Sequence, residues 1–252
     1  MTQPEAGEWN QTAALRDRLP AGWRRHARQA HLDLIEQWIG TPRGRWLKTD
    51  LYEELSPHRA LLPCLGGSWI GMDVSTAVAA GVKPRVSRIT VGDVRRLPFR
   101  DGAFDGVLST STLDHFDEPH GITLALAELR RILLPSGCLL LTLDNRSNPA
   151  IRLRNALPKA AQMATRLVPF PTGVTLSDQT GRIALAEAGF TVAQVGYLLH
   201  APHIVGTRLA HLRWYERAML PRLDQLMHTR LGRYSAHYVA FLCYADGAGV
   251  AR

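Results

Sequence analysis

The feature that most constrains the fold is the stretch 92–116, where two short apolar runs each lead into polar residues. The run 89–91 predicts a strand that ends at Gly92, so Asp93 stands at its carboxyl end. The run 104–108 predicts a second strand, which passes directly into Ser109, Thr110, Ser111 and Thr112. Open α/β sheets bind ligands just beyond the carboxyl ends of their strands. The stretch therefore predicts a ligand site at this edge, where Asp93 can accept a hydrogen bond from a purine amino group or a ribose.

The same residues carry a family resemblance. Gly-Asp-Val-x-x-Leu-Pro-Phe at 92–99, Asp-Gly-x-Phe-Asp at 101–105 and Leu-Asp-His-Phe at 113–116 resemble the middle of class I S-adenosylmethionine-dependent methyltransferases. Within that class they are most similar to the small-molecule branch that includes the ubiquinone and menaquinone methyltransferases. The resemblance covers about residues 45–145 and implies S-adenosylmethionine as the cofactor. It also implies a Rossmann-like α/β fold, with a doubly wound, seven-stranded, mostly parallel sheet whose last strand runs antiparallel between the fifth and the sixth.

The order of the remaining segments agrees with this fold class. Alternating strands and helices predict a doubly wound sheet with right-handed crossovers. Ser56-Pro57 is typical of a helix start and predicts a short helix that ends by Gly66. Pro135 and Gly137 predict a break between a helix and the next strand. Further strands are predicted at 45–50, 69–73, 138–143, 190–199 and 238–244, and further helices at 76–80, 122–134 and 181–188.

Three kinds of appendage are expected around the methyltransferase domain at 41–246. Residues 1–40 are predicted to form an N-terminal helical cap, because 23–39 repeat apolar residues with helical spacing. This basic amphipathic helix fits docking on its own core better than a membrane surface, which remains the alternative. The domain is expected to carry a lid at 146–178 and a helical insertion at 204–231. A short tail, 247–252, follows.

The turn after the first predicted strand departs from the family pattern. The family keeps a Gly-x-Gly-x-Gly there, but this chain has Asp50, Leu51, Tyr52, Glu53 and Glu54. S-adenosylmethionine has no phosphate to cradle and needs acceptors for its amino group and ribose, so the loss of glycine argues little against the cofactor. At least one of Asp50, Glu53 and Glu54 is therefore predicted to bind it, with Asp50 and Glu53 as the chosen candidates. The alternative is a solvated helix start, where carboxylates are favourable.

Asp73 ends the next predicted strand and lies twenty residues after Glu53, close to the spacing at which nucleotide-binding α/β units place a ribose-binding carboxylate. We expect Asp73 to bind the ribose, and a role as helix cap, for it or for Ser75, is the alternative. The resemblance implies further cofactor contacts at Asp93, Val94, Ser109 and Thr110. Two spaced carboxylates, Asp73 and Asp93, thus define the predicted cofactor site.

His115 is the best-placed imidazole for proton transfer, since it follows the polar strand end. It is the candidate catalytic residue, although the family often has a histidine there with only a packing or cofactor-contact role. His200 and His203 suggest a metal pair, but Pro202 between them rules out a regular helical face and no third ligand is evident. No metal site is predicted.

Composition limits the alternatives. The chain has 252 residues, 46% of them hydrophobic, which suits one sizeable α/β domain. The net charge of +8 is a modest excess, and the motifs of base-modifying enzymes are missing after the fourth strand, so a nucleic-acid partner is not favoured. Three separated cysteines, no signal peptide and no apolar run of membrane length predict a cytoplasmic protein with no transmembrane segment. A homodimer is left open.

The leading functional hypothesis is methyl transfer to a small molecule by in-line displacement. Positioning of the acceptor can supply much of the catalysis, so a dedicated base is not obligatory. Arginines in the predicted lid and insertion suggest a phenolic, anionic or lipid-linked acceptor. One alternative is a non-catalytic cofactor-binding or partner module, which the missing glycines suggest. Another is a non-methylating enzyme on the same fold, such as a cyclase.

Overall fold

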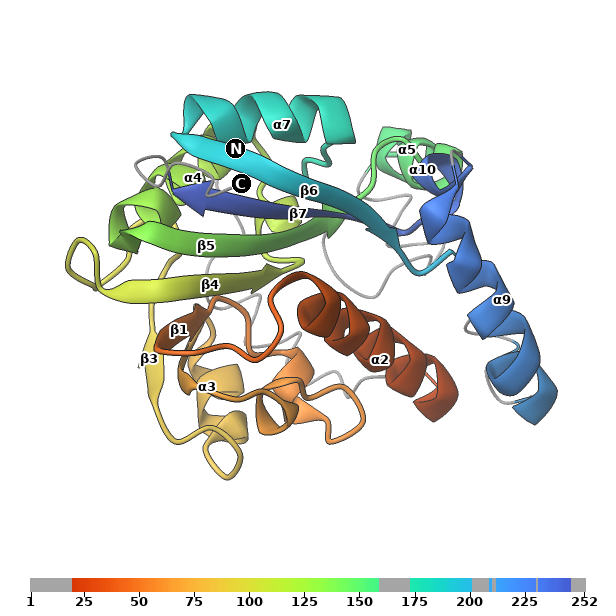
Figure 1. The fold of residues 1–252 in the computed structure, drawn as a ribbon, viewed down its shortest axis with the longest axis horizontal. Helices are drawn as coiled ribbons and strands as arrows, with labels where there is room; N and C mark the ends of the chain where they lie inside the picture. Colours follow the sequence, from red (N-terminus) through yellow and green to blue (C-terminus); the bar gives the residue numbers. More distant parts are fainter. Residues whose placement is uncertain (1–19, 159–172, 201–208, 210–211, 230, 246–252) are drawn as a thin grey trace.

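The computed structural model describes residues 20–158, 173–200, 209, 212–229 and 231–245. Within this part of the chain, seven strands form one sheet in the order β3-β2-β1-β4-β5-β7-β6 (Figure 1). The strands are β1 (Arg45–Lys48), β2 (Ser68–Asp73), β3 (Ile89–Val91), β4 (Phe104–Thr110), β5 (Leu133–Asp144), β6 (Phe190–Leu198) and β7 (Tyr238–Ala245).

The strand directions confirm the predicted fold class. β1 pairs in parallel with β2 and β4, β2 with β3, and β4 with β5. β7 runs antiparallel to both of its neighbours, β5 and β6. The strand order reverses between β1 and β4, which is the point where open α/β sheets form a ligand crevice. In the β5–β7 ladder, Asp144 pairs with Tyr238 at that same edge.

Helices cover both faces of the sheet, because a strand such as β5 has apolar side chains on both of its faces. Its residues Leu139, Leu141 and Leu143 pack in one core cluster, while Leu140 packs in another, because successive side chains point to opposite faces. The first cluster includes α4 (Pro119–Ile132) and α7 (Asp178–Glu187). The second includes α2 (Ala21–Trp38), so this predicted cap helix docks on the core. A third, smaller cluster lies under α3 (Thr76–Val82).

Two local predictions are wrong. Ser56-Pro57 does not start an α-helix: a turn follows, and only the 3₁₀ helix η2 (Leu62–Cys64) forms. Helix α4 ends at Ile132, and β5 already begins at Leu133, so Pro135 lies inside a strand. The β4–β5 register shifts between Phe104 and Gly106, beside this segment. Such irregular pairing tolerates a proline, which cannot donate to the ladder.

The segment after β6 lies against α2. It contains the π-helical η4 (Tyr215–Met219), α9 (Leu220–Asp224), the 3₁₀ helix η5 (Gln225–His228) and α10 (Gly232–Ser235). Arg25 of α2 makes a two-oxygen ion pair with Glu216, with the shorter contact at 2.7 Å. The predicted lid contributes α5 (Pro149–Ala156), while its residues 159–172 and parts of the predicted insertion (204–208, 210–211, 230) lie outside the described residues.

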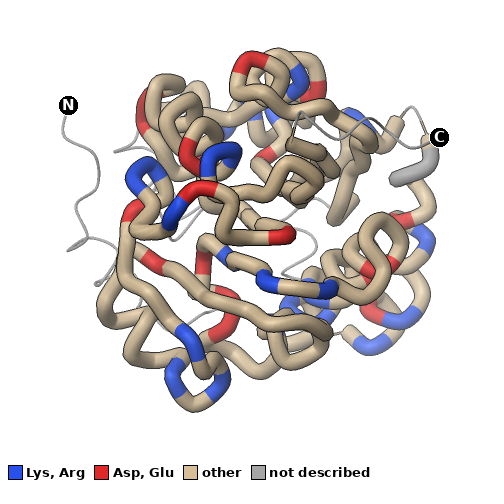
Figure 2. Tube along the Cα trace, turned by 60° about the vertical axis from the view of Figure 1, so that its left-hand side comes forward, with Lys and Arg blue, Asp and Glu red and all other residues tan. Residues whose placement is uncertain are grey.

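Charge and hydropathy add two observations. Lysine and arginine residues are spread around several sides of the chain rather than gathered on one face (Figure 2). Among the described residues, no helix is long and apolar enough to span a bilayer.

Candidate functional site

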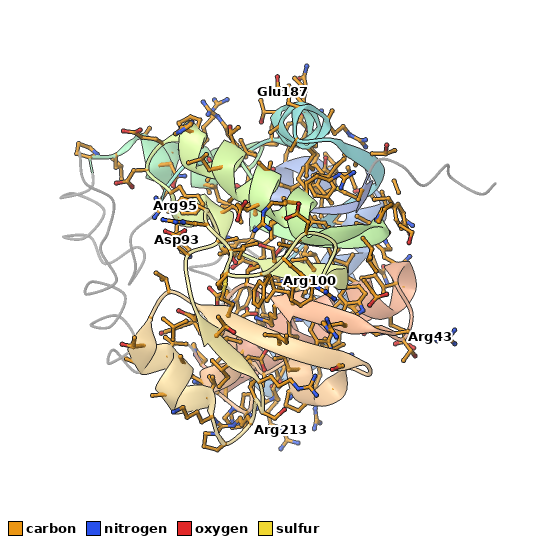
Figure 3. All side chains as sticks on the ribbon, turned by 90° about the vertical axis from the view of Figure 1, so that its left-hand side faces the viewer. Arg43, Asp93, Arg95, Arg100, Glu187 and Arg213 are labelled. Atoms are coloured by element: carbon orange, nitrogen blue, oxygen red, sulfur yellow. The ribbon has the colours of Figure 1, made fainter. Side chains whose placement is uncertain are left out.

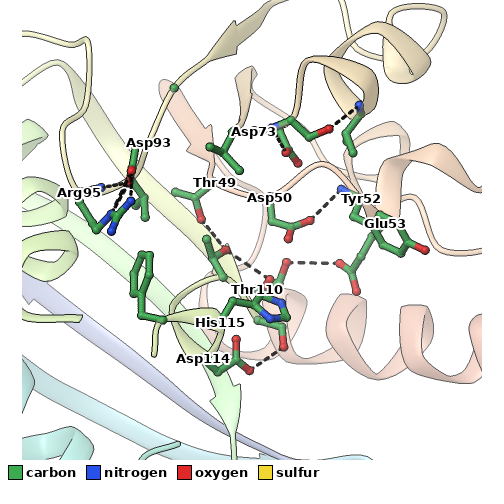
Figure 4. A pocket seen from close by; sticks show the side chains of 18 of the residues that line it. Thr49, Asp50, Tyr52, Glu53, Asp73, Asp93, Arg95, Thr110, Asp114 and His115 are labelled. Carbon is green, nitrogen blue, oxygen red and sulfur yellow. Dashed lines mark hydrogen bonds and ion pairs between the residues drawn. The ribbon is translucent and has the colours of Figure 1, made fainter. Parts of the chain in front are cut away.

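A pocket of about 160 Å³ opens at the carboxyl ends of β1 to β5 (Figure 4). The structure brings most of the predicted site residues to its wall: Asp50, Glu53, Asp73, Asp93, Val94, Thr110 and His115. Ser109 is the exception. It is fully buried in the sheet, where its hydroxyl accepts a hydrogen bond from Thr49 Oγ1 at 3.0 Å.

A buried lysine holds the glycine-free turn. Lys48, which ends β1, is fully buried, and its Nζ donates to the Asp50 carbonyl and, at 3.3 Å, to Thr110 Oγ1. The same Nζ lies 3.7 Å from a carboxylate oxygen of both Glu53 and Glu54. Burial opposes the charge of Lys48, but the surrounding carboxylates, Glu53 and Glu54 foremost with Asp50 and Asp73, together raise its pKa. Sequence reasoning missed Lys48; the signal was a lysine inside an apolar strand.

The geometry of this turn explains why glycine is not needed. Among the described non-glycine residues, only Ser111 and Leu199 have positive φ angles, of 51° and 58°. The backbone of 49–55 therefore stays in conformations that any residue adopts.

The two glutamates of the turn have different roles, and neither belongs to a solvated helix start. Glu54 is fully buried and accepts from the backbone N–H of Leu61 at 3.1 Å and of Leu62 at 3.3 Å, so it ties the turn to the following segment. Glu53 lines the pocket and pairs with Arg59 at 3.1 Å. Burial raises the pKa of Glu53, but Arg59 and Lys48 together lower it to about 2.

Asp73 lies at the β2 end of the pocket and is almost fully buried. Its carboxylate accepts from the backbone N–H of Leu51 at 2.9 Å and of Ser75 at 2.8 Å, each on a different oxygen. Burial, followed by the charge of Asp50, raises the pKa of Asp73 to about 7. Ser75 caps α3 by accepting from Val78 N at 3.1 Å, so the helix-cap role belongs to Ser75. Asp73 keeps unused lone pairs toward the pocket, because a carboxylate accepts about four hydrogen bonds.

Asp93 and Arg95 form an ion pair at the rim of the pocket, and Figure 3 shows them side by side at this edge. Arg95 donates to both carboxylate oxygens of Asp93, and its guanidinium lies over the Phe116 ring at 5.0 Å from the centroid. Burial opposes ionisation, but the hydrogen bonds from Arg95 lower the pKa of Asp93. Val94, beside them, is buried and lines the pocket.

The β4 end of the pocket contains a sharp turn. Ser111 adopts a left-handed conformation directly after β4, and its hydroxyl donates to Asp114 Oδ2 at 2.8 Å. The backbone N–H of Asp144, at the end of β5, donates to the same oxygen at 3.0 Å. Figure 4 shows Asp114 and His115 together at this end, away from Asp73. Backbone strain of this kind concentrates at functional sites.

The remaining histidine prediction concerned His200. Its ring is buried and makes hydrogen bonds with Ser235 Oγ at 2.9 Å and the Tyr197 carbonyl at 3.1 Å, which gives it a structural role. His203 lies outside the described residues. In the part of the chain that the structure describes, no group of three His, Cys, Asp or Glu side chains could hold a metal ion.

Comparison with known proteins supports a family assignment. Residues 56–141 match the family described as "Methyltransferase domain". A demethylmenaquinone methyltransferase from Corynebacterium efficiens is 33% identical over 123 residues, which cover 48% of this chain and 50% of that protein. A Bos taurus protein described as a probable tRNA methyltransferase 9B is 31% identical over 72 residues, covering 29% of this chain and 16% of its own length. The chain thus spans about half of the first relative, and less of the second.

Solved structures give the fold over a longer stretch. A Thermotoga maritima protein described as a SAM-dependent methyltransferase, possible histamine N-methyltransferase, superimposes with a TM-score of 0.61 at 18% identity. The superposition covers 89% of this chain and 91% of that one. At this identity the likeness concerns the fold, and the family match is confined to residues 56–141. This chain therefore has the fold of S-adenosylmethionine-dependent methyltransferases, and residues 56–141 match the methyltransferase domain family.

Proposed function

We propose that this protein transfers a methyl group from S-adenosylmethionine to a small-molecule acceptor. The observation that carries the proposal is that the β1–β3 strand ends and the β4–β5 strand ends line one and the same pocket. Asp73 and Val94 line the first part, and Asp114 and His115 line the second. A cofactor and an acceptor can therefore meet in one partly enclosed space.

The residues of the first part fit the cofactor. The unused lone pairs of Asp73 suit the two ribose hydroxyls, and buried Val94 offers an apolar surface to the adenine beside Asp93. Asp50 adds a carboxylate on the β1 side. A wall rich in carboxylates also suits the cofactor's positively charged sulfonium and ammonium groups.

The chemistry needs mainly positioning. S-adenosylmethionine supplies a methyl group on a positively charged sulfur, which accepts the electron pair of the broken bond. The chain's task is to hold the acceptor in line with that bond and to exclude water, for which a fixed pocket is sufficient. His115 lines the pocket beside Asp114 and is our candidate for taking a proton from the acceptor.

Calorimetry with S-adenosylmethionine and S-adenosylhomocysteine tests the proposal. We expect both to bind in one-to-one stoichiometry, and incubation with pooled metabolites to yield a methylated product detected by mass spectrometry. If neither ligand binds at millimolar concentration, the proposed methyl transfer is wrong, and a non-catalytic partner module becomes the better hypothesis. Binding without any methylated product would favour a non-methylating enzyme on this fold.

Cofactor binding should depend on pH. Because the pKa of Asp73 is raised to about 7 by burial and by Asp50, part of the free protein carries a proton there near neutrality. A bound cation lowers that pKa, so binding releases protons, and affinity rises as pH increases from about 5.5 to about 8. Calorimetry at about pH 6.5 in two buffers of different ionisation enthalpy measures the release. Affinity that falls over this range would contradict the assigned role of Asp73.

A nucleic-acid substrate is the competing acceptor, since one relative is described as a tRNA methyltransferase and the net charge is +8. That relative matches over 29% of this chain, and the basic residues are spread over several sides (Figure 2). These observations favour a small acceptor. Salt-sensitive retention on RNA or DNA, together with methyl incorporation into it, would reverse this preference.

A further inference from the structure

We propose that the β4–β5 end of the pocket is an acceptor subsite for amines, in which Asp114 Oδ1 receives a hydrogen bond from the nitrogen that is methylated. The inference rests on the proposed methyl transfer and names its substrate class. It replaces the anionic and phenolic acceptors that the arginine content suggests.

The carboxylate of Asp114 has one oxygen that its described hydrogen bonds do not use. Asp114 lines the pocket and is only 3% exposed. Both of its described hydrogen bonds, from Ser111 Oγ and from Asp144 N, go to Oδ2. Oδ1 is buried and has no hydrogen-bond partner within the part of the chain that the structure describes. Leaving a buried carboxylate oxygen without a donor is unfavourable, and such atoms in native structures call for an explanation. A ligand that donates a hydrogen bond supplies it.

The orientation of the Asp114 carboxylate is fixed by its neighbours. Ser111 holds Asp114 from a left-handed backbone position, and the Asp144 N–H holds it from the neighbouring strand. Two donors on one oxygen restrain the carboxylate of Asp114, which Figure 4 shows next to His115. A group held in this way needs no reorganisation when the acceptor arrives.

The wall of the pocket carries more carboxylates than guanidinium groups. The described lining contains six carboxylates, including Asp114, and two guanidiniums, those of Arg59 and Arg95. Each guanidinium is already paired with a carboxylate of the wall, Glu53 or Asp93. An anionic acceptor would therefore meet a negative wall whose cations are engaged, whereas an amine meets the complementary charge.

Asp144 differs from Asp114 in this respect. Its carboxylate is paired with Arg154, and it lies 3.3 Å from His237 Nε2. Burial opposes ionisation, but His237 and Arg154 lower the pKa of Asp144. Burial and the charge of Asp144 instead raise the pKa of Asp114 to about 6. Among the described residues, Asp114 is thus the carboxylate of this pair that has no ion pair with an arginine.

The reaction balances without further reagents. The bound ammonium first gives a proton to His115, which lines the pocket beside Asp114. The lone pair of the resulting amine then forms the new nitrogen–carbon bond while the carbon–sulfur bond breaks, and sulfur keeps that electron pair. Positive charge moves from sulfur to nitrogen, where the carboxylate of Asp114 stabilises it as it develops. The product leaves as the methylated ammonium, and the proton held by His115 passes to solvent.

The test uses three probes of similar shape: benzylamine, benzyl alcohol and benzoate. Each is titrated into the full-length protein saturated with S-adenosylhomocysteine. We expect benzylamine to bind at least about tenfold more tightly than benzoate, the size of one charge-assisted hydrogen bond. Because this comparison uses the unmodified chain, it does not depend on whether a variant folds.

Variants assign the preference to one residue. Asp114→Asn should remove the preference for benzylamine and leave affinity for S-adenosylhomocysteine within about twofold. Asp101→Asn is the matched control, because Asp101 is 80% exposed in its side chain and lies before β4, at the opposite end of the strand. It should leave both affinities unchanged.

The outcomes separate this inference from the proposed function. If S-adenosylhomocysteine binds but benzylamine shows no preference over benzoate, or no probe binds, the amine subsite is wrong and methyl transfer still stands. If benzyl alcohol binds as well as benzylamine, the subsite recognises a neutral donor and the amine assignment is overturned. If S-adenosylhomocysteine itself does not bind, the proposed function fails first.

Discussion

Replacing Lys48 with methionine is expected to lower the free energy of unfolding by about 3–5 kcal/mol, because it leaves Glu54 buried without its cation. Lys48 and Glu54 are both fully buried, so solvent cannot replace the lost partner. Typical domains are stable by only about 5–15 kcal/mol, so the loss is a large fraction of the total. Equilibrium denaturation followed by circular dichroism measures it.

Two further variants make this result interpretable. Lys83→Met removes an exposed lysine at the end of α3 and should change stability by less than about 0.5 kcal/mol. Adding Glu54→Gln to Lys48→Met should recover part of the loss, because the uncompensated charge is removed as well. A loss below about 1 kcal/mol for Lys48→Met would mean that the ammonium does not hold the turn.

The second large effect concerns the cofactor. Asp73→Ala is expected to weaken binding of S-adenosylhomocysteine by about 1–3 kcal/mol, through loss of a charged hydrogen-bond acceptor. This corresponds to between about fivefold and 150-fold in dissociation constant. Isothermal titration calorimetry at about pH 8, above the raised pKa of Asp73, gives the comparison with the carboxylate ionised.

The substitution also removes the acceptor for two backbone N–H groups, those of Leu51 and Ser75, so stability must be followed in parallel. Asp73→Asn is the companion variant, because its amide oxygen still accepts one hydrogen bond. It should fall between the parent and Asp73→Ala in affinity. Unchanged affinity in both variants, with the fold intact, would count against ribose binding by Asp73.

Much of the fold could be predicted from the sequence, because strands and helices are marked by local patterns of apolar and polar residues. Apolar runs that end in Asp73 or Asp93 mark strand ends, and these ends meet at one edge because parallel strands share a direction. The failures were local ambiguities. Ser56-Pro57 suits a turn as well as a helix start, and Pro135 does not mark a strand boundary where the pairing is irregular.

The site was less predictable, because its contacts join distant segments. Lys48 reaches Thr110 across 62 residues, and the orientation of Asp114 depends on Asp144 from another strand. Ser109 is a residue that was predicted to contact the cofactor and does not line the pocket. Its position next to Thr110 made both residues candidates. Successive side chains along β4 point to opposite faces, so Ser109 is buried against Thr49 while Thr110 lines the pocket.

The glycine-free turn has a consequence for conformational entropy. Glycine loses more backbone freedom on folding than any other residue. The glycine-free turn at 50–54 therefore has fewer unfolded conformations to lose than a glycine-rich turn of the same length would have. Its ordered state is then fixed by internal charges around Lys48 rather than by contact with a ligand. This wall of the pocket is therefore already in place before the cofactor arrives, and little of the binding free energy is spent on ordering it.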